Sequence, residues 1–311
     1  PEQVQVALKT LWEPFAHFPF TDAVSRSVHL SAILTAVQRP MLETAPAFAW
    51  NAHTAGTGKS KAAKAVGWLC GNEPVESPWS TEAEEQRKRL MATLIRGPGS
   101  MLLDNISGAM ESDTLCAILT SSRYQDRRLG ASEEISTPTR VLVTATGNNL
   151  RLVGDLSRRV LVATIDHGVE SPERLAFPFD PVQRVRERWF YYRAAALTVL
   201  RGFFAAGAPR HGPGSVGTYE QWEGLIRQCV CWLEAEGLAP FELADPAEAI
   251  NQNYEADPET QKLRALITAW KLQNADGKPL KVSELIKRSD TFENTNESGA
   301  AQLREVLDEI A

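Results

Sequence analysis

The chain has 311 residues, of which 43% are hydrophobic and 23% are charged, and its formal net charge is −6 at pH 7. These values are ordinary for a globular protein in water, and the length allows one α/β domain with a smaller second domain. The negative charge excludes a general electrostatic attraction to nucleic acid, so any such binding must come from a local basic surface.

The cysteines show no C-x-x-C spacing, which argues against a zinc site and against a disulfide framework. They are Cys70, Cys116, Cys229 and Cys231. No apolar run approaches the length of a membrane span, and the first residues do not resemble a signal peptide. We therefore expect a cytoplasmic protein without a membrane partner. The first residue is Pro1 rather than methionine, and from this we expect a piece of a longer chain.

The first predicted part is a helical lead-in, residues 1–45. Residues 2–14 and 21–38 have the pattern of helices, and Thr21 and Asp22 are suited to cap the second one. A short apolar run, residues 47–50, follows as a strand. It leads into a glycine loop and a segment that favours helix, which is the order that a phosphate-binding P-loop requires. The predicted phosphate-binding residues are Thr54, Ala55, Gly56, Thr57, Gly58, Lys59 and Ser60.

Each part of this loop has a physical role. Gly56 and Gly58 let backbone N–H groups turn toward phosphate oxygens, and the helix that starts near Lys59 adds the positive end of its dipole. Lys59 can reach the outer phosphates, and the Ser60 hydroxyl is the expected Mg²⁺ ligand. His53 stands where the strict G-x-x-x-x-G-K-[ST] pattern has its first glycine, and we interpret it as a loop residue.

A charged helix over residues 82–95 comes next, and a short buried strand, residues 100–103, then ends in Asp104 and Asn105. A hydrophobic strand with an aspartate at its C-terminal tip is the Walker B arrangement. The carboxylate of such an aspartate lies beside the P-loop and holds magnesium. Asp104 is therefore the second predicted metal ligand, with Ser60.

Beyond a helix over residues 112–122, two short extended runs around Gly130 predict a hairpin. A strand over residues 140–146 then runs into Gly147, Asn148 and Asn149. A polar residue at the tip of this strand can reach a terminal phosphate or the attacking water. A turn-forming Gly-Asn-Asn is the alternative interpretation.

Arg158 and Arg159 precede a fifth strand, residues 160–165, and no acidic residue is directly adjacent to them in the sequence. They could form a surface patch. In an oligomer, they could instead reach phosphates bound by a neighbouring subunit, where positive charge stabilises the transition state.

The sequence predicts four parts: the lead-in, a core at residues 46–180, a helical region at 181–240 and a small domain at 241–311. The helical region opens with a long helix that is rich in arginine in its first half. The last part has a linker and three predicted helices, residues 259–273, 282–288 and 300–310. These suit a small helical or winged-helix-like domain.

In this order, the motifs resemble the AAA+ ATPases, and more closely the superfamily 3-type helicase modules of phages, plasmids and other mobile elements. The resemblance covers roughly residues 20–240. The segments that carry it are Gly56–Ser60, Leu103–Asn105, Arg128–Gly130, Thr146–Asn149 and Gly154–Arg159.

The resemblance implies an α/β fold with a five-stranded, mainly parallel sheet and a central P-loop strand. It implies ATP and Mg²⁺ as cofactors, single-stranded DNA as a partner and assembly into a homo-oligomeric ring, a hexamer. A fused or associated primase and a role in DNA replication in a bacterium or phage-infected host would fit the same family.

The resemblance also implies particular residue roles. Asn148 or Asn149 would be the sensor that contacts the terminal phosphate. Arg158 or Arg159 would be the arginine finger. Arg127 and Arg128 would lie on a hairpin that faces DNA in the pore of the ring.

Asn105 is the more serious departure from the family pattern, since an acidic residue normally follows the Walker B aspartate and polarises water. Either a carboxylate from elsewhere replaces it, with Glu84, Glu85 and Glu111 as candidates, or hydrolysis is slow. Two functions therefore remain: an ATP-hydrolysing DNA helicase or translocase, and an ATP-dependent switch or loader that assembles a partner on DNA. The arginine hairpin favours the first function, and the acidic net charge favours the second.

Overall fold

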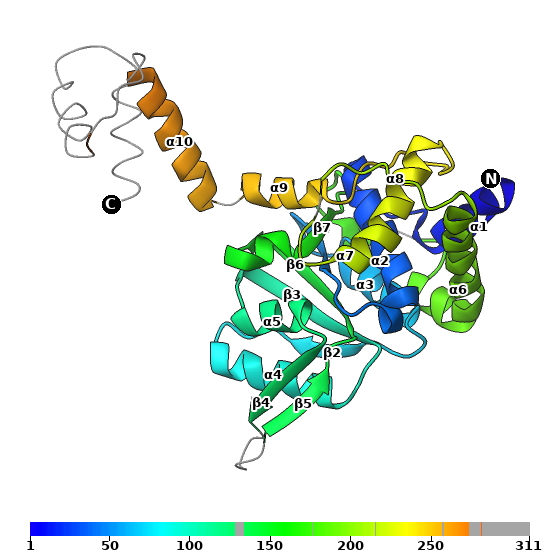
Figure 1. The fold of residues 1–311 in the computed structure, drawn as a ribbon, viewed down its shortest axis with the longest axis horizontal. Coiled ribbons are helices and arrows are strands. Elements are labelled where there is room, and N and C mark those ends of the chain that lie inside the picture. Colours follow the sequence, from blue (N-terminus) through cyan, green and yellow to red (C-terminus); the bar gives the residue numbers. More distant parts are fainter. Residues whose placement is uncertain (128–133, 176, 215, 257, 274–280, 282–311) are drawn as a thin grey trace. The chain divides into compact units, whose positions relative to one another are not determined.

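The structure is a computed structural model that describes residues 1–127, 134–175, 177–214, 216–256, 258–273 and 281 (Figure 1). By its internal contacts the chain divides into two units, residues 1–253 and residues 254–311. The first unit contains the sheet and the helices that cover it. The four-part division expected from the sequence stays a prediction.

A five-stranded parallel sheet forms the centre of the first unit, with strand order β2-β3-β6-β1-β7. This confirms the predicted fold class. The P-loop strand β1, expected to be central, lies fourth in this order, and β6 is the middle strand. The strands are β1 (Ala47–Ala52), β2 (Val75–Pro78), β3 (Ser100–Met110), β6 (Leu142–Leu152) and β7 (Val160–Thr164).

Strands β3 and β6 are longer than the sequence predicts. Their pairing continues past Asp104, because a register shift between Leu103 and Ile106 accommodates an irregular backbone there. Asn105 lies in this irregularity with a φ of 58°, a left-handed conformation that asparagine tolerates better than most residues. The bulge explains why the apolar pattern stops at Leu103 although the strand does not.

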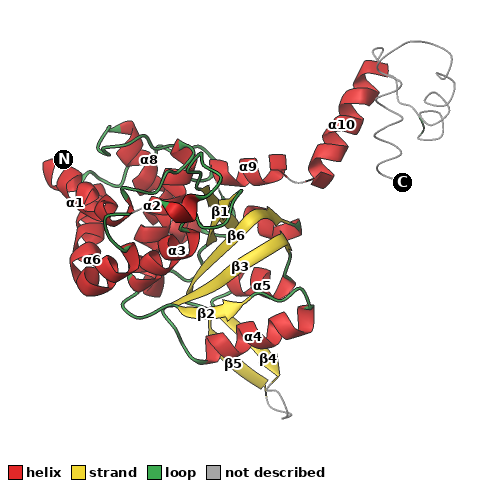
Figure 2. Cartoon of the chain, turned by 180° about the vertical axis from the view of Figure 1, so that it is seen from behind, coloured by secondary structure: helices red, strands yellow, loops and turns green. Residues whose placement is uncertain are grey.

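Helices cover both faces of the sheet (Figure 2). Phe48 and Trp50 of β1 belong to the core under α1, α2, α3, α6 and α8, whereas Ala47 and Ala49 belong to the core under α4 and α5. This alternation is the period-two pattern of a strand buried on both faces. The helices are α1 (Glu2–Trp12), α2 (Ala23–Gln38), α3 (Lys59–Trp68), α4 (Ala83–Ile95), α5 (Asp113–Thr120), α6 (Pro181–Ala205), α7 (Glu220–Trp222) and α8 (Gln228–Ala235).

Helix α2 is buried along nearly its whole length, and its small hydroxyl side chains bond to distant segments. Asp22 caps it as predicted, accepting from Ser25 N at 2.6 Å. Ser25 Oγ accepts from Thr164 N, and Thr35 Oγ1 accepts from Trp222 Nε1 at 2.9 Å. Such bonds remove the cost of burying polar atoms. Helix α2 is therefore an internal support for β1 and β7.

Two antiparallel strands, β4 (Arg123–Arg127) and β5 (Glu134–Pro138), form the predicted hairpin. Residues 128–133, including Arg128, lie outside the described residues. The hairpin joins β6 through residues 139–141, and buried Arg39 holds this junction. Its guanidinium donates to Thr139 O at 2.8 Å and to Val141 O at 3.0 Å.

A helix α9 (Glu248–Ala256) occupies part of the segment that the sequence predicts to be a linker. In the first unit, Asn253 Nδ2 donates to Ser157 O and Val160 O, at 2.9 and 2.8 Å. The second unit contains α10 (Pro258–Gln273), as predicted. The predicted helices at 282–288 and 300–310 lie outside the described residues. Among the helices that are described, none is long and apolar enough to cross a membrane.

Candidate nucleotide-binding site

The P-loop connects β1 to α3 and has the backbone that its glycines allow. Gly56 and Gly58 have φ values of 75° and 87°, a region that other L-residues rarely adopt. Gly58 is the N-cap of α3, so the free N–H groups of that helix face the loop. The loop and the helix terminus together form a site for an anion.

Lys59 is the first residue of α3, and its side chain is folded back into the loop. Its Nζ donates to Thr54 O at 3.1 Å and to Thr57 Oγ1 at 3.0 Å. Only 8% of Lys59 is exposed. Burial lowers the pKa of its ammonium, and the carboxylate of Asp104 opposes this shift. The loop thus holds a cation at its centre.

Ser60 and Asp104 meet across the carboxyl edge of the sheet. Ser60 Oγ donates to Asp104 Oδ1 at 2.7 Å, and the Thr146 hydroxyl donates to the same oxygen. Thr146 Oγ1 in turn accepts from Asn105 N at 3.1 Å. A hydroxyl and a carboxylate that already touch are hard oxygen ligands of the kind that Mg²⁺ prefers, so the residues present fit this ion.

A cavity of about 280 Å³ lies at this edge. Its lining includes the whole segment 55–61, together with Asn105, Thr146 and Asn148. Asn148 Oδ1 is buried, and no described residue forms a hydrogen bond with it. Asn149, in contrast, has a φ of 50° and its Oδ1 lies 2.9 Å from His53 Nδ1. Of the two sensor candidates, Asn148 is the one that lines the cavity.

None of the described residues that line this cavity is a glutamate, and the three candidate carboxylates for a base in place of Asn105 are absent from the lining. Glu84 and Glu111 line a different cavity, beside α4 and the end of β3. Glu84 bonds to Lys88, which lowers the pKa of this carboxyl, and Glu85 bonds to Arg89. The role proposed for them from the sequence therefore has no geometric support.

Glu173 is a carboxylate that the sequence does not single out. It lies in a short 3₁₀ helix, Pro172–Arg174, on the connection from β7 to α6. A β-carbon added at Gly56 would be 2.9 Å from Glu173 Cβ and 3.1 Å from its Oε2. Its side chain therefore lies against the glycine loop, where only glycine leaves room for it.

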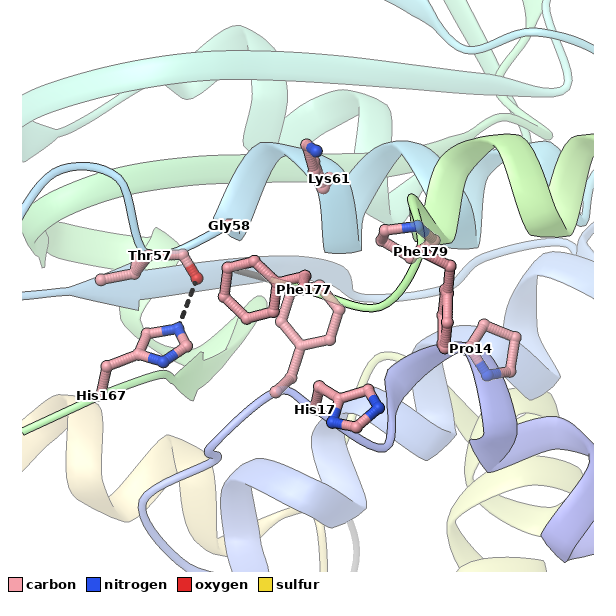
Figure 3. Close-up of a pocket in the computed structure, with 10 residues that line it drawn as sticks. Pro14, His17, Thr57, Gly58, Lys61, His167, Phe177 and Phe179 are labelled. Atoms are coloured by element: carbon pink, nitrogen blue, oxygen red, sulfur yellow. Dashed lines mark hydrogen bonds between the residues drawn. The ribbon is translucent and has the colours of Figure 1, made fainter. Parts of the chain in front are cut away.

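A second, mostly apolar pocket of about 40 Å³ adjoins the P-loop on the side of Thr57 and Gly58 (Figure 3). Its lining residues are Pro14, His17, Phe18, Thr57, Gly58, Lys61, His167, Phe177, Phe179 and Pro181. His167 Nε2 lies 3.1 Å from Thr57 O, which ties this pocket to the loop. The rings of His167 and Phe177 meet edge to face, as do those of His17 and Phe179.

This pocket is not among the features predicted from the sequence, although a repeated tripeptide points to it. The tripeptide Phe-Pro-Phe occurs twice, at residues 18–20 and 177–179, each time followed by an aspartate that caps a helix. Asp22 caps α2, and Asp180 Oδ1 accepts from Val182 N at 2.8 Å at the start of α6. The repeat brings two aromatic segments, far apart in the sequence, to one side of the P-loop.

The two arginines before β7 differ in their surroundings, and both have an acidic partner. Asp155 accepts from Arg158 Nε at 3.0 Å and from Arg159 Nη2 at 2.7 Å. Hydrogen bonds from Arg158, with the nearby charge of Arg159, hold the pKa of Asp155 below its usual value. The Arg159 side chain is 12% exposed and also donates to Cys116 O at 2.7 Å, whereas the Arg158 side chain is 47% exposed. Arg158 is thus the one that is free to leave its partner.

The two arginines expected at a DNA-facing hairpin are only partly placed. Arg127 is the last residue of β4 and pairs with Glu134 in the strand register. Nothing is described of its side chain, and Arg128 lies outside the described residues. In the same strand, Arg87 of α4 forms an ion pair with Asp126, the residue before Arg127. A role of Arg127 and Arg128 in binding DNA therefore stays a prediction.

No protein-family model and no curated protein matches this chain. Among solved structures, the C-terminal region of NrS-1 matches with a TM-score of 0.46 and 13% identity, over 99% of this chain and 67% of that one. The JCV helicase matches with a TM-score of 0.31 and 12% identity, over 81% and 73%. The SCCmec type IV Cch helicase matches with a TM-score of 0.35 and 13% identity, over 91% and 62%. The fold itself, defined by its strand order and its glycine loop, is that of a P-loop NTPase.

Proposed function

We propose that this chain is a Mg²⁺-dependent ATPase that works as a DNA helicase or translocase. The observation that carries the proposal is that Lys59 and Ser60 of α3 and Asn148 of β6 line one cavity, while Asp104 of β3 bonds to Ser60. A buried cation, two oxygen ligands and an unbonded amide oxygen at the end of a glycine loop suit a nucleoside triphosphate and its metal.

In this proposal, the backbone of residues 54–60 and the Lys59 ammonium bind the phosphates, and Ser60 and Asp104 hold Mg²⁺. When bound, the metal neutralises phosphate charge. Thr146 orients Asp104 through their shared hydrogen bond, and Asn148 presents its side-chain amide to the terminal phosphate or to water. The aromatic pocket beside Thr57 and Gly58 would hold the base of the nucleotide, because flat rings suit stacking and edge contacts.

An ATP-dependent switch or loader is the second candidate function, and a specific observation favours it. Among the described residues, no glutamate lines the cavity, and Asn105, which cannot act as a base, occupies the position next to Asp104. A site that binds ATP tightly and hydrolyses it slowly would serve a switch better than a motor.

The deciding experiment measures ATP hydrolysis with and without single-stranded DNA, together with unwinding of a forked duplex. We expect DNA to stimulate hydrolysis several-fold and the wild-type chain to unwind the fork. Lys59→Ala should abolish both activities, whereas Lys64→Ala, a lysine on the same helix that pairs with Glu76, should not. Slow hydrolysis that DNA does not stimulate, with ATP still bound, would support the switch or loader instead.

A homo-oligomeric ring, a hexamer, is part of the same proposal, since an arginine finger acts only across a subunit boundary. The exposure of Arg158 supports it. An associated primase, and replication of a phage or mobile element, belong to the proposal as its biological setting.

A further inference from the structure

Helix α6 carries exposed aromatic side chains that the nucleotide site does not use. Trp189, Phe190 and Tyr191 are consecutive in the sequence. Phe190 is 72% exposed, Tyr191 is 49% exposed and Trp189 is half-buried. Consecutive side chains on a helix point about 100° apart, so three of them cannot all face the core. The next residue, Tyr192, is buried and donates to Glu13 Oε2 at 2.8 Å, and it is the one that packs inward.

The same helix is strongly basic in a chain whose net charge is −6. It contains five arginines and one acidic residue, Glu187. Glu187 accepts a hydrogen bond from Gln183. Arg186 and Arg188 are exposed, and no carboxylate of the described residues forms an ion pair with either of them. Their charge is therefore directed to solvent.

Rings and guanidinium groups lie against one another on this face. The guanidinium carbon of Arg188 is 4.6 Å from the centroid of the Tyr191 ring, and that of Arg193 is 5.6 Å from the Trp189 ring. The helix is distorted within the cluster, since Arg188 has φ −128° and ψ 24°. The exposed rings of Phe190 and Tyr191 follow directly after this distortion.

A groove of about 450 Å³ continues the cluster toward the end of α3. Trp189, Phe190, Arg193 and Leu197 line one side of it, and Cys70 and Gly71 line the other. Gly71 has a φ of 102°. Two aromatic rings and the guanidinium of Arg193 therefore line this groove.

We propose that this surface, which we name the α6 aromatic face (Arg186, Arg188, Trp189, Phe190 and Tyr191), binds single-stranded nucleic acid. Unpaired bases stack on exposed aromatic rings and on guanidinium planes, while arginines neutralise the phosphates between them. A duplex hides the faces of its bases, and an apolar protein partner would leave the arginine charge unmatched. Base stacking and charge complementarity together therefore select a single strand as the occupant.

This surface is separate from the predicted hairpin contact. In Figures 1 and 2, α6 lies beside α1 and α3, apart from the β4–β5 hairpin. The inference adds a contact for a strand outside the site of hydrolysis, and it does not require that the chain hydrolyse ATP.

The test is a titration of fluorescent oligothymidine with the full chain and its variants, followed by anisotropy at several salt concentrations. Phe190→Leu/Tyr191→Leu keeps apolar volume but removes the rings, and it should weaken binding about 5- to 100-fold. Phe190→Tyr/Tyr191→Phe keeps the rings and should bind like the wild type. Arg186→Gln/Arg188→Gln should weaken binding and flatten its salt dependence, because fewer counterions are released.

Met41→Ala/Arg210→Gln is the matched control, since it removes an exposed apolar side chain and an exposed arginine outside α6. Circular dichroism should show every variant folded. Photocrosslinking of iodouracil-labelled DNA should attach it to the peptide that contains residues 189–191.

Wild-type affinity in the leucine variant, with the crosslink elsewhere, would overturn the inference. So would an unchanged DNA affinity accompanied by a changed oligomeric state, because the face would then dock protein. Failure of the proposed function gives a different result: ATP hydrolysis would be absent, while the pattern of DNA binding among these variants would remain.

Discussion

His29 shows how one buried side chain ties stability to pH. Its Nδ1 accepts from Trp50 Nε1 at 3.1 Å, and no described residue bonds to its Nε2. The rings of Trp12, Phe15 and Phe20 surround it. Burial lowers the pKa of His29 from 6.5 to about 3, so the folded chain keeps this ring neutral where the unfolded chain would protonate it.

The sign of the pH effect follows from that shift. The pKa of His29 is lower in the folded chain than in the unfolded chain. Above pH 6.5 the ring is neutral in both states and the free energy of unfolding is not affected. As the pH falls from 6.5 toward 3, only the unfolded chain binds the proton, and the free energy of unfolding decreases. We expect the free energy of unfolding to fall by roughly 1.4 kcal/mol for each pH unit below about 6, beyond the effect of other groups. Urea unfolding followed by tryptophan fluorescence can compare the wild type with His29→Gln, which cannot titrate. Parallel pH profiles of the two proteins would contradict the prediction.

Substitution of Glu173 distinguishes two roles of its carboxylate: repulsion of bound ATP and action as the base in hydrolysis. Its carboxylate lies against Gly56, next to the proposed phosphate site, and the residue is exposed. We expect Glu173→Gln to bind ATP about 2- to 5-fold more tightly, because it removes a solvent-screened negative charge. Glu170→Gln, an exposed carboxylate on the same connection, is the control. If hydrolysis is lost instead, with binding unchanged, Glu173 is the missing base.

Single residues also show what the sequence could not reveal. Lys59, Ser60 and Asp104 were identifiable because their spacing defines a motif, and the structure brings them together as expected. Glu173 belongs to no motif, and only the path of the chain after β7 brings it to the loop. Asp155 was overlooked as a partner of Arg158 because the 3₁₀ turn that brings them together is not apparent in the sequence.

At the scale of elements, the strands and helices of the core could be predicted because their periodicity is strong. Strand β3 and helix α9 are harder to predict from the sequence. The bulge at Asn105 interrupts the apolar pattern while the ladder continues, and α9 begins after Asp245 and Pro246, which signal a turn. The aromatic pocket required knowing that residues 18–20 and 177–179 meet, which is a property of the tertiary fold.

The packing of α1 against α6 depends on Gly202, and this gives a prediction. A β-carbon at Gly202 would lie 2.3 Å from Val4 Cγ2, and valine, being β-branched, adjusts poorly. We expect Gly202→Ala to destabilise the chain by about 1–3 kcal/mol, despite the roughly 1 kcal/mol by which alanine favours a helix over glycine.

Thermal or urea unfolding would measure this effect. Gly224→Ala, where a β-carbon meets nothing within 4 Å, is the matched control. Adding Val4→Ala to Gly202→Ala should recover part of the loss, since it removes the clashing methyl group. Additive losses in the double variant would argue against a direct clash.

For the molecule as a whole, the decisive prediction concerns contacts between copies. Arg158→Ala should lower hydrolysis about 10³-fold, while nucleotide binding and stability remain, if this arginine acts on a neighbour's phosphates. Arg159→Ala should instead lower stability by about 1–3 kcal/mol, because it removes the donor to Cys116 O and to Thr120 Oγ1 and the ion pair with Asp155. The exposed Arg96 provides a neutral control.

Mixing supplies the sharper measurement. Arg158→Ala subunits keep an intact P-loop, and Lys59→Ala subunits keep an intact arginine, so mixed interfaces should regain part of the activity. Native mass spectrometry can show that the two kinds of subunit assemble together. If mixed assemblies form but hydrolysis is not recovered, Arg158 does not act on a neighbouring subunit, and its role is limited to the bond with Asp155.

The junction held by Arg39 has a mechanical consequence. The hairpin and strand β6, which carries Asn148, are consecutive in the chain, and Arg39 fixes the carbonyl groups on both sides of Arg140 between them. Arg39 is 3% exposed, so breaking these bonds would leave buried acceptors without a donor. The joint is therefore stiff. A pull on the hairpin would therefore reach the nucleotide cavity along β6 without bending at residues 139–141.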